Sequence, residues 1–416
     1  MKPRALISIA MILFVWLLVS FPLAAQEGNK LSAAPRKYTL QVLPGPPGLT
    51  GLGNAVTIND RGWVTGLSNP SDDSYDTAVL WRHGQATNLG NLAGKPGYNS
   101  APGNNNINDT GWVVGGSETG VDDPNYENFG QFTCLPTVIH CAPNIIEGFL
   151  WQSTTNTMIA LPSLVPPQPE GGGNNSVALG ANNQEIIGYA ENGVYDPTNC
   201  VSPQVYHYEG VVWKLGPDGT PFVSRRLSPV ADDTVSAAIG INEGGDIVGA
   251  SAPCGFGFIP THAVLWKKDG SVIDLGNLGG ATTLPSAINN QGQVVGNSVL
   301  SDDLTPRAFL WQEGSGMQDL GALPGDDQSG ASAINDSGEV VGVSCNSATG
   351  NCRSFHWQRG VMTDISALPA VSRLLGVTAN DINSRGEIAI AANDPTVTDP
   401  STGSPLQIPA VLIPEP

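Results

Sequence analysis

The chain has 416 residues, of which 37 are acidic and 18 are lysine or arginine, so its formal net charge is −19. Nucleic acid and anionic membrane surfaces are poor partners for so acidic a chain, and we expect neither as a ligand. With 51 glycines, 33 prolines and 13% charged residues, the composition favours turns over long surface helices, while 40% apolar residues in ordered alternation argue against disorder.

The first 25 residues have the pattern of a secretory signal peptide. A basic start with Lys2 and Arg4 precedes an apolar run over residues 5–21, and small residues end at Ala25. The alternative is an uncleaved N-terminal anchor, but the run is marginal for a bilayer span, which needs roughly 20 residues. We predict a signal peptide over residues 1–25, a short segment over 26–36 and a single domain over 37–416. The mature chain is then soluble, free of the membrane, and periplasmic or extracellular.

The remaining chain repeats one motif, Ile-Asn-x-x-Gly-x-Val-Val-Gly, which is clearest at residues 334–342. Its seven asparagines are separated by 49, 74, 60, 47, 46 and 48 residues, so two of the units contain insertions. These asparagines are Asn59, Asn108, Asn182, Asn242, Asn289, Asn335 and Asn383. A period of this size is typical of propellers, solenoids and arrays.

Each unit has the pattern of four short strands. In the sixth unit, apolar residues alternate with polar ones over 332–334, 339–344, 353–357 and 361–365, and an Asn-Asp-Ser-Gly turn separates the first two runs. No window after the N-terminus shows sustained helical periodicity. The unit is therefore predicted to be a four-stranded antiparallel blade of an all-β chain.

The two ends of the chain predict a closed ring. Residues 37–43 resemble the end of a unit, because Leu43-Pro44-Gly45 matches Leu323-Pro324-Gly325, and the seventh unit lacks its fourth strand after residues 406–413. A ring closed by pairing the first strand into the last blade removes free edges. We therefore predict a seven-bladed β-propeller of four-stranded antiparallel blades, closed by an N-terminal strand that completes the last blade.

Six cysteines in an exported chain predict disulfides. We expect Cys134 to pair with Cys141 and Cys345 with Cys352, each within one loop, and Cys200 with Cys254 between neighbouring units. Free buried thiols are the alternative. A zinc site is less supported, because no Cys-x-x-Cys occurs and His140 and His356 complete no standard ligand spacing.

One tryptophan recurs in the third strand of six units. These residues are Trp81, Trp151, Trp213, Trp266, Trp311 and Trp357, with Val411 or Leu412 at the corresponding place in the seventh unit. They are either sugar-stacking platforms or buried aromatics that pack between neighbouring sheets. We favour burial, because a residue present in every blade usually serves the blade. For the same reason we interpret the seven asparagines as turn-forming side chains that satisfy backbone groups.

Several segments resemble the HAF repeat, a bacterial family of extracellular repeats named for a His-Ala-Phe strand. They are His262-Ala-Val-Leu-Trp266, Arg307-Ala-Phe-Leu-Trp311, Asp274-Leu-Gly276, Asp319-Leu-Gly321 and Ser286-Ala-Ile-Asn289. The second and third units depart from this pattern, with Gly148-Phe-Leu-Trp151 and Val211-Val-Trp213. The resemblance implies secretion and a repeat fold, and it brings no catalytic residue.

Loop lengths predict the binding face. In an up-and-down blade, the loops after the second and fourth strands point to one face, and the longest insertions, at residues 116–147, 191–207, 253–261 and 393–405, all follow a second strand. Variable loops on a rigid scaffold commonly carry binding sites. Paired acidic residues occur on this face, and we take them as candidate binding residues and as ligands for a weakly held Ca²⁺. They are Asp72, Asp73, Asp122, Asp123, Asp232, Asp233, Asp302, Asp303, Asp326 and Asp327.

Three functions fit this pattern. The first is a binding or scaffold propeller that recognises an extracellular glycan, peptide or envelope protein through the long-loop face. The second is a polysaccharide hydrolase or lyase that uses acidic residues of that face. Such an enzyme needs an acid and a base held several ångström apart in one pocket. The third is a purely structural surface repeat protein. Because a fold does not give a function, we favour a binding protein without catalysis, monomeric and with no cofactor other than Ca²⁺.

Overall fold

The computed structural model describes residues 36–47, 49, 53–70, 75–123, 144–164, 175–195, 206–253, 261–398 and 403–416. Residues Arg36–Pro416 form one unit. The predicted signal peptide, the segment 26–35, Asp72, Asp73, Cys134, Cys141, Cys200 and Cys254 lie outside the described residues. In the part that is described, no helix is long and apolar enough to cross a membrane.

The sixth repeat shows how the sequence forms a sheet. Its strands are β22 (Gln328–Ile334), β23 (Val340–Asn346), β24 (Asn351–Gln358) and β25 (Val361–Asp364). Gly338 ends the first turn with a φ of 72°, a conformation that favours glycine. The predicted four-stranded antiparallel meander is confirmed for this unit, with the first three strands longer than predicted and the fourth shorter.

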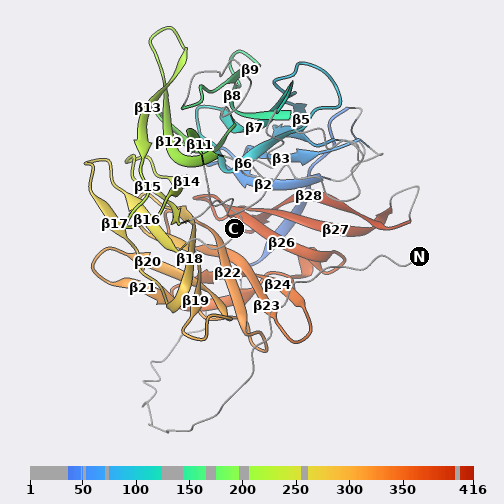
Figure 1. Ribbon diagram of the computed structural model, residues 1–416. Coiled ribbons are helices and arrows are strands. Elements are labelled where there is room, and N and C mark those ends of the chain that lie inside the picture. Colours follow the sequence, from blue (N-terminus) through green and yellow to red (C-terminus); the bar gives the residue numbers. More distant parts are fainter. Residues whose placement is uncertain are drawn as a thin grey trace, which may run out of the picture. The chain divides into compact units, whose positions relative to one another are not determined.

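Four further sheets have four antiparallel strands each. They consist of β2 (Gly53–Ile58), β3 (Val64–Ser68), β4 (Thr77–Arg82) and β5 (Gln85–Asn88); of β14 (Val235–Ile241), β15 (Ile247–Ala252), β16 (His262–Trp266) and β17 (Val272–Asp274); of β18 (Gly279–Ile288), β19 (Val294–Leu300), β20 (Pro306–Gln312) and β21 (Gly316–Asp319); and of β26 (Leu375–Ile382), β27 (Ile388–Thr398), β28 (Pro405–Pro414) and β1 (Tyr38–Val42). A 3-10 turn, η2 (Pro369–Val371), precedes β26. Figure 1 follows these sheets in chain order from blue to red.

The second and third repeats form one eight-stranded sheet. Its halves are the meanders β6 (Ser100–Ile107), β7 (Trp112–Asp122), β8 (Asn144–Gln152) and β9 (Thr157–Ala160), and β10 (Ser176–Ala181), β11 (Ile186–Tyr195), β12 (Tyr206–Leu215) and β13 (Pro221–Leu227). One parallel bridge between Gly180 and Asn105 joins them. The close approach requires Gly103, because a Cβ there would lie 2.6 Å from the Cα of Leu179. The sheets of the described residues thus make an all-β, propeller-like arrangement.

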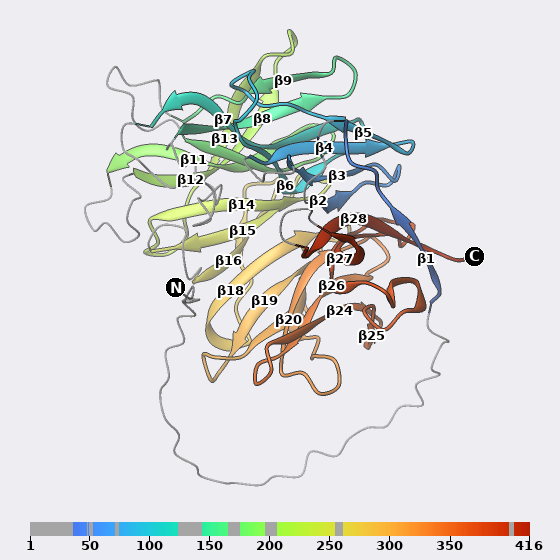
Figure 2. The same ribbon diagram turned by 90° about the vertical axis from the view of Figure 1, so that its right-hand side faces the viewer.

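The N-terminal strand completes the last sheet. In β1, Leu40 is opposite Leu412 and Val42 is opposite Ala410 of β28, and Figure 2 shows the two strands side by side. The predicted pairing of residues 37–43 with the end of the chain is therefore confirmed. Just before β1, Arg36 Nη1 lies 2.9 Å from Oε1 of the buried Glu339 in the sixth repeat. The His356 ring, the Asn335 amide and the Arg36 guanidinium lower the pKa of Glu339 to about 2.

The hydrophobic core lies between successive sheets. Trp311 packs with Leu265 of the preceding sheet, Trp151 packs with Leu80, and Trp81 packs with Val411 of the last sheet. The six repeated tryptophans are at most 7% exposed, and Leu412 is fully buried. These side chains therefore have no free ring face for a sugar, and the predicted packing role is confirmed.

Three predicted loops are partly strand. β7 continues to Asp122, β11 to Tyr195 and β27 to Thr398, so these second strands extend well past the repeated motif before the chain leaves the described residues at 124–143, 196–205 and 399–402. We call the end of the sheets where β3, β7, β11, β15, β19, β23 and β27 lead into the next strand the long-loop face. The opposite end, which carries the asparagine turns, is the turn face.

Candidate functional site

The seven repeat asparagines form a closed ring of hydrogen bonds at the turn face. Each side-chain Nδ2 donates to the backbone oxygen of the asparagine in the next repeat, and the last one donates to the first. The distances from Asn59, Asn108, Asn182, Asn242, Asn289, Asn335 and Asn383 are 3.0, 2.9, 2.9, 3.2, 3.0, 3.0 and 3.0 Å. All seven side chains are buried.

The side-chain oxygen of each asparagine accepts backbone N–H groups within its own turn. In the sixth repeat, Asn335 Oδ1 accepts the backbone N–H groups of Ser337 and Glu339, both at 3.0 Å. The turn-forming role predicted for these residues is therefore confirmed. Local sequence patterns do not predict the bond to the next repeat, because its acceptor lies 46 to 74 residues away in six of the bonds and 324 residues away in the bond from Asn383 to Asn59. Each asparagine thus joins two repeats while it shapes one.

The ring surrounds a pocket of about 170 Å³ at the turn face, lined by residues from most of the repeats. Of the described residues, five that line this axial pocket are acidic, and none is lysine or arginine: Asp60, Asp109, Glu243, Asp336 and Asp381. Some of them tie neighbouring turns together, since Asp60 Oδ1 accepts Ser384 N at 2.8 Å and Asp336 Oδ1 accepts Asn290 N at 2.9 Å. The pocket therefore disfavours anions.

Asp381 is the most perturbed of these carboxyl groups. Its oxygens accept the backbone N–H groups of Ile58 and Ile382, both at 2.8 Å. The side chain touches the narrow pocket but is otherwise surrounded by protein atoms, and this loss of hydration raises its pKa to about 7, with Asp60 adding repulsion.

This pKa predicts how stability depends on pH. The folded state holds the Asp381 proton more tightly than the unfolded state, so this residue lowers the free energy of unfolding as the pH rises from about 4 to about 7, and no further above that. Asp381→Asn should therefore gain stability relative to the wild type across this interval and keep a constant difference above it. Urea unfolding at several pH values measures this difference. Parallel curves for the two proteins would contradict it.

The acidic pairs predicted for the long-loop face serve local structure. Asp233 Oδ2 accepts Ser251 Oγ at 2.6 Å and lies 2.8 Å from His262 Nδ1. In the sixth repeat, Asp326 Oδ2 is bound in the same way by Ser344 Oγ at 2.8 Å and by Arg353 at 2.9 Å. The residue four positions before the repeated tryptophan thus ties the loop to the sheet. A polar residue that recurs four positions before the tryptophan, as His262 and Arg353 do, is the sequence pattern that indicates this structural role.

The other described acidic residues predicted for the long-loop face also lie apart from one another. Asp302 caps the turn through Leu304 N and Thr305 N, Asp303 accepts Ala281 N at 2.8 Å, and Asp327 accepts Ser347 N at 2.7 Å. Asp123 is buried against Asn175, while Asp122 and Asp232 are exposed. Among the described residues, no three acidic, histidine or cysteine side chains are grouped to hold a metal ion. The predicted Ca²⁺ ligands are therefore not brought together there.

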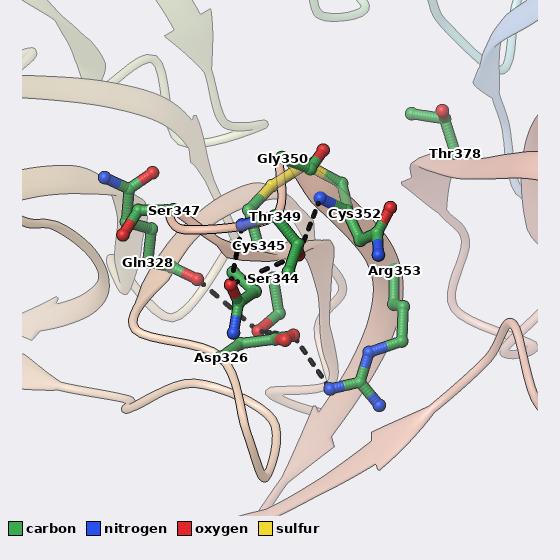
Figure 3. Close-up of a disulfide and its surroundings, with 12 residues drawn as sticks. Asp326, Gln328, Ser344, Cys345, Ser347, Thr349, Gly350, Cys352, Arg353 and Thr378 are labelled. Atoms are coloured by element: carbon green, nitrogen blue, oxygen red, sulfur yellow. Dashed lines mark hydrogen bonds and ion pairs between the residues drawn. A yellow bond between two sulfur atoms is a disulfide. The ribbon is translucent and has the colours of Figure 1, made fainter.

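One disulfide joins Cys345 and Cys352 at the long-loop face, as predicted. Figure 3 shows it across the ends of β23 and β24, next to the Arg353 and Asp326 pair. The pairs predicted for the other four cysteines fall outside the described residues.

Loss of this disulfide should destabilise the protein without unfolding it. The bridge closes a loop with a sequence separation of 7, for which chain entropy predicts about 2 kcal/mol. The sheet should persist, because Cys345 and Cys352 are also opposite each other in the strand register. Denaturant unfolding of Cys345→Ser/Cys352→Ser measures the loss. A double variant with wild-type stability would contradict this expectation.

No protein-family model and no curated protein matches the sequence. Among solved structures, a prolyl endopeptidase superposes with a TM-score of 0.50 at 12% identity, over 89% of this chain and 51% of that one. A post-proline cleaving enzyme from Rickettsia typhi gives 0.48 at 9% identity, over 84% and 50%, and dipeptidyl peptidase 4 from Porphyromonas gingivalis gives 0.39 at 9%, over 80% and 50%. The chain spans about half the length of these proteins, and the likeness to the first shows the fold alone.

Proposed function

We propose that the chain is an exported binding or scaffold protein, built on a closed seven-bladed propeller, that recognises an extracellular ligand through its long-loop face. The seven-blade count is supported by the ring of seven asparagines and by the two complete meanders within the eight-stranded sheet. In this interpretation the bridge between Gly180 and Asn105 is a local contact between two blades. Membership of the HAF-repeat family and a monomeric state are parts of the same proposal.

The distribution of exposed apolar side chains carries the proposal. Among the residues that the structure describes, ten large apolar side chains are exposed, and six of these lie at the long-loop face. These six are Val121, Val194, Tyr195, Leu304, Leu375 and Val397, and their exposure ranges from 44 to 67%. This concentration of exposed apolar groups at the loop end of a rigid scaffold is where we expect a partner to bind.

An enzymatic function has less support. A hydrolase or lyase needs a free acid and a free base at opposite sides of one substrate. The described acidic residues of the long-loop face belong to different repeats, and Asp233, Asp302 and Asp326 are engaged by their own neighbours. We therefore propose binding without catalysis, and a glycan, a peptide or an envelope protein as the ligand.

The test combines an array and a pair of variants. The purified chain is screened on glycan and peptide arrays while released sugar ends are assayed, and Leu304→Ser is compared with Val361→Ser. Leu304 is 67% exposed at the long-loop face, and Val361 is 48% exposed on an outermost strand. We expect a ligand whose binding is weakened in the first variant alone. Turnover of a saccharide, or equal effects of the two variants, would contradict the proposal.

A further inference from the structure

A second candidate binding surface, besides the long-loop face, lies between two outermost strands, β13 of the third repeat and β17 of the fourth. It is a groove of about 630 Å³, within the range of ligand-binding clefts. Arg225, Arg226 and Lys267 line it, against the single carboxylate of Asp274. A basic groove is unexpected in a chain with a net charge of −19. It is also separate from the long-loop face and goes beyond the function proposed for that face.

A β-bulge turns Arg225 into this groove. Val223 is opposite Trp213, whereas Arg225 is opposite Val212, so Ser224 is an extra residue in the ladder. Trp213 and Val223 pack toward the second repeat, while Val212 packs toward the fourth. Arg225 shares the face of Val212 and therefore points at the fourth repeat, where its Nη1 donates to Lys267 O at 3.3 Å.

The guanidinium of Arg225 has capacity for an anion. No carboxylate of the described residues lies within ion-pair distance of it, whereas Arg226 is 3.6 Å from Glu209 and Lys267 is 3.0 Å from Glu313. Arginine has five N–H donors in a planar fork that matches a carboxylate. The bond to Lys267 O uses one of these donors, which leaves a bidentate site open.

The strand beside this arginine can accept another strand. β13 is the outermost strand of its half-sheet and has seven residues, while the other outermost strands have three to five. An outermost strand presents unpaired backbone N–H and C=O groups, and an extended peptide can bind to them. A saccharide has no regular series of backbone amides with which to extend the sheet at this edge.

We propose that the groove between β13 and β17 binds an acidic peptide segment in extended conformation. The peptide backbone pairs with the free edge of β13, and one of its carboxylate side chains enters the groove and binds Arg225. The exposed Val272, at 49%, provides apolar contact for a neighbouring side chain of the peptide.

The test uses fluorescent peptides and the full chain. The probe is a capped peptide that alternates glutamate and threonine; its two controls carry glutamine for glutamate, or N-methyl groups on alternate amides. Variants are Arg225→Gln, Arg225→Lys and the matched Arg359→Gln, whose arginine lies in the turn between β24 and β25. Binding is followed by fluorescence anisotropy, with an oligogalacturonate as a second anionic probe. Melting curves establish that the variants are folded.

We expect the glutamate peptide to bind, Arg225→Gln to weaken it about tenfold or more, Arg225→Lys to fall between, and Arg359→Gln to leave it unchanged. Both control peptides should bind weakly. Equal binding by Arg225→Gln, or by either control peptide, overturns the proposal. So does Arg225-dependent binding of the oligogalacturonate alone, which assigns the groove to acidic saccharides. If Arg225→Gln self-associates and the wild type binds no peptide, the proposal is also wrong. The arginine then only prevents the edge of β13 from pairing with another copy of the chain.

Discussion

A chain that begins at Pro44 should lose about 5 kcal/mol of stability relative to one that begins at Arg36, because β1 contributes Tyr38 and Leu40 to the core and Leu43 follows it there. It also leaves β28 as a free edge, which promotes aggregation. Both chains keep Pro44, whose carbonyl oxygen accepts Trp81 Nε1 at 2.6 Å. Thermal and denaturant unfolding of the two chains measures the difference.

A synthetic peptide of residues 36–43 provides the control for this prediction. Added to the shortened chain, it should restore part of the melting temperature, because it can pair again with β28 and place Arg36 beside Glu339. A peptide with Tyr38 and Leu40 replaced by serine should not. Equal stability of the two chains would contradict the closing role of β1.

The asparagine ring predicts the second large effect. Asn182→Ala should cost about 3 kcal/mol, because the N–H groups of Gln184 and Glu185 lose their acceptor and the Asn242 carbonyl loses a donor. The neighbouring Asn183 is exposed and its side chain donates to the exposed Glu243 carboxylate, so Asn183→Ala should change stability little. The midpoints of denaturant unfolding compare the two variants.

Asn182→Asp separates the two roles of the ring asparagine. Aspartate keeps the oxygen that accepts Gln184 N and Glu185 N, but it places a second oxygen against the Asn242 carbonyl in place of the amide donor. If the residue only formed its turn, aspartate would be tolerated. We expect it to destabilise at least as much as alanine, because two acceptors then face each other in a buried position. A neutral Asn182→Asp would refute the ring.

The sequence predicted those parts of the fold that depend on local pattern. The Asn-x-x-Gly turns, the alternation around Val340 and Val341, and the spare strand at Tyr38–Val42 all follow from periodicity and turn chemistry, and the pairings agree with them. The eight-stranded sheet did not follow, because it depends on a backbone approach at Gly103 that only the packed structure produces.

The candidate sites were less predictable, because they depend on partners that are distant in the chain. Asp233 and Asp326 were predicted from their loops, but His262 and Arg353, which engage them, decide that they are structural. The axial pocket collects single acidic residues from different repeats, so no one segment has an unusual charge density. Arg225 faces its groove only because the ladder has one extra residue at Ser224.

The pairing of β1 with β28 also sets the order of events during synthesis. β1 leaves the ribosome early and must wait for residues 405–414, its partner strand. At 5 to 20 residues per second, this delay is on the order of 20 to 70 s. During that time the five residues of β1 lack their partner strand, while the residues of η2 and β26 are synthesised before those of β28. A message that stops before residue 405 therefore yields a chain in which β1 has no partner strand.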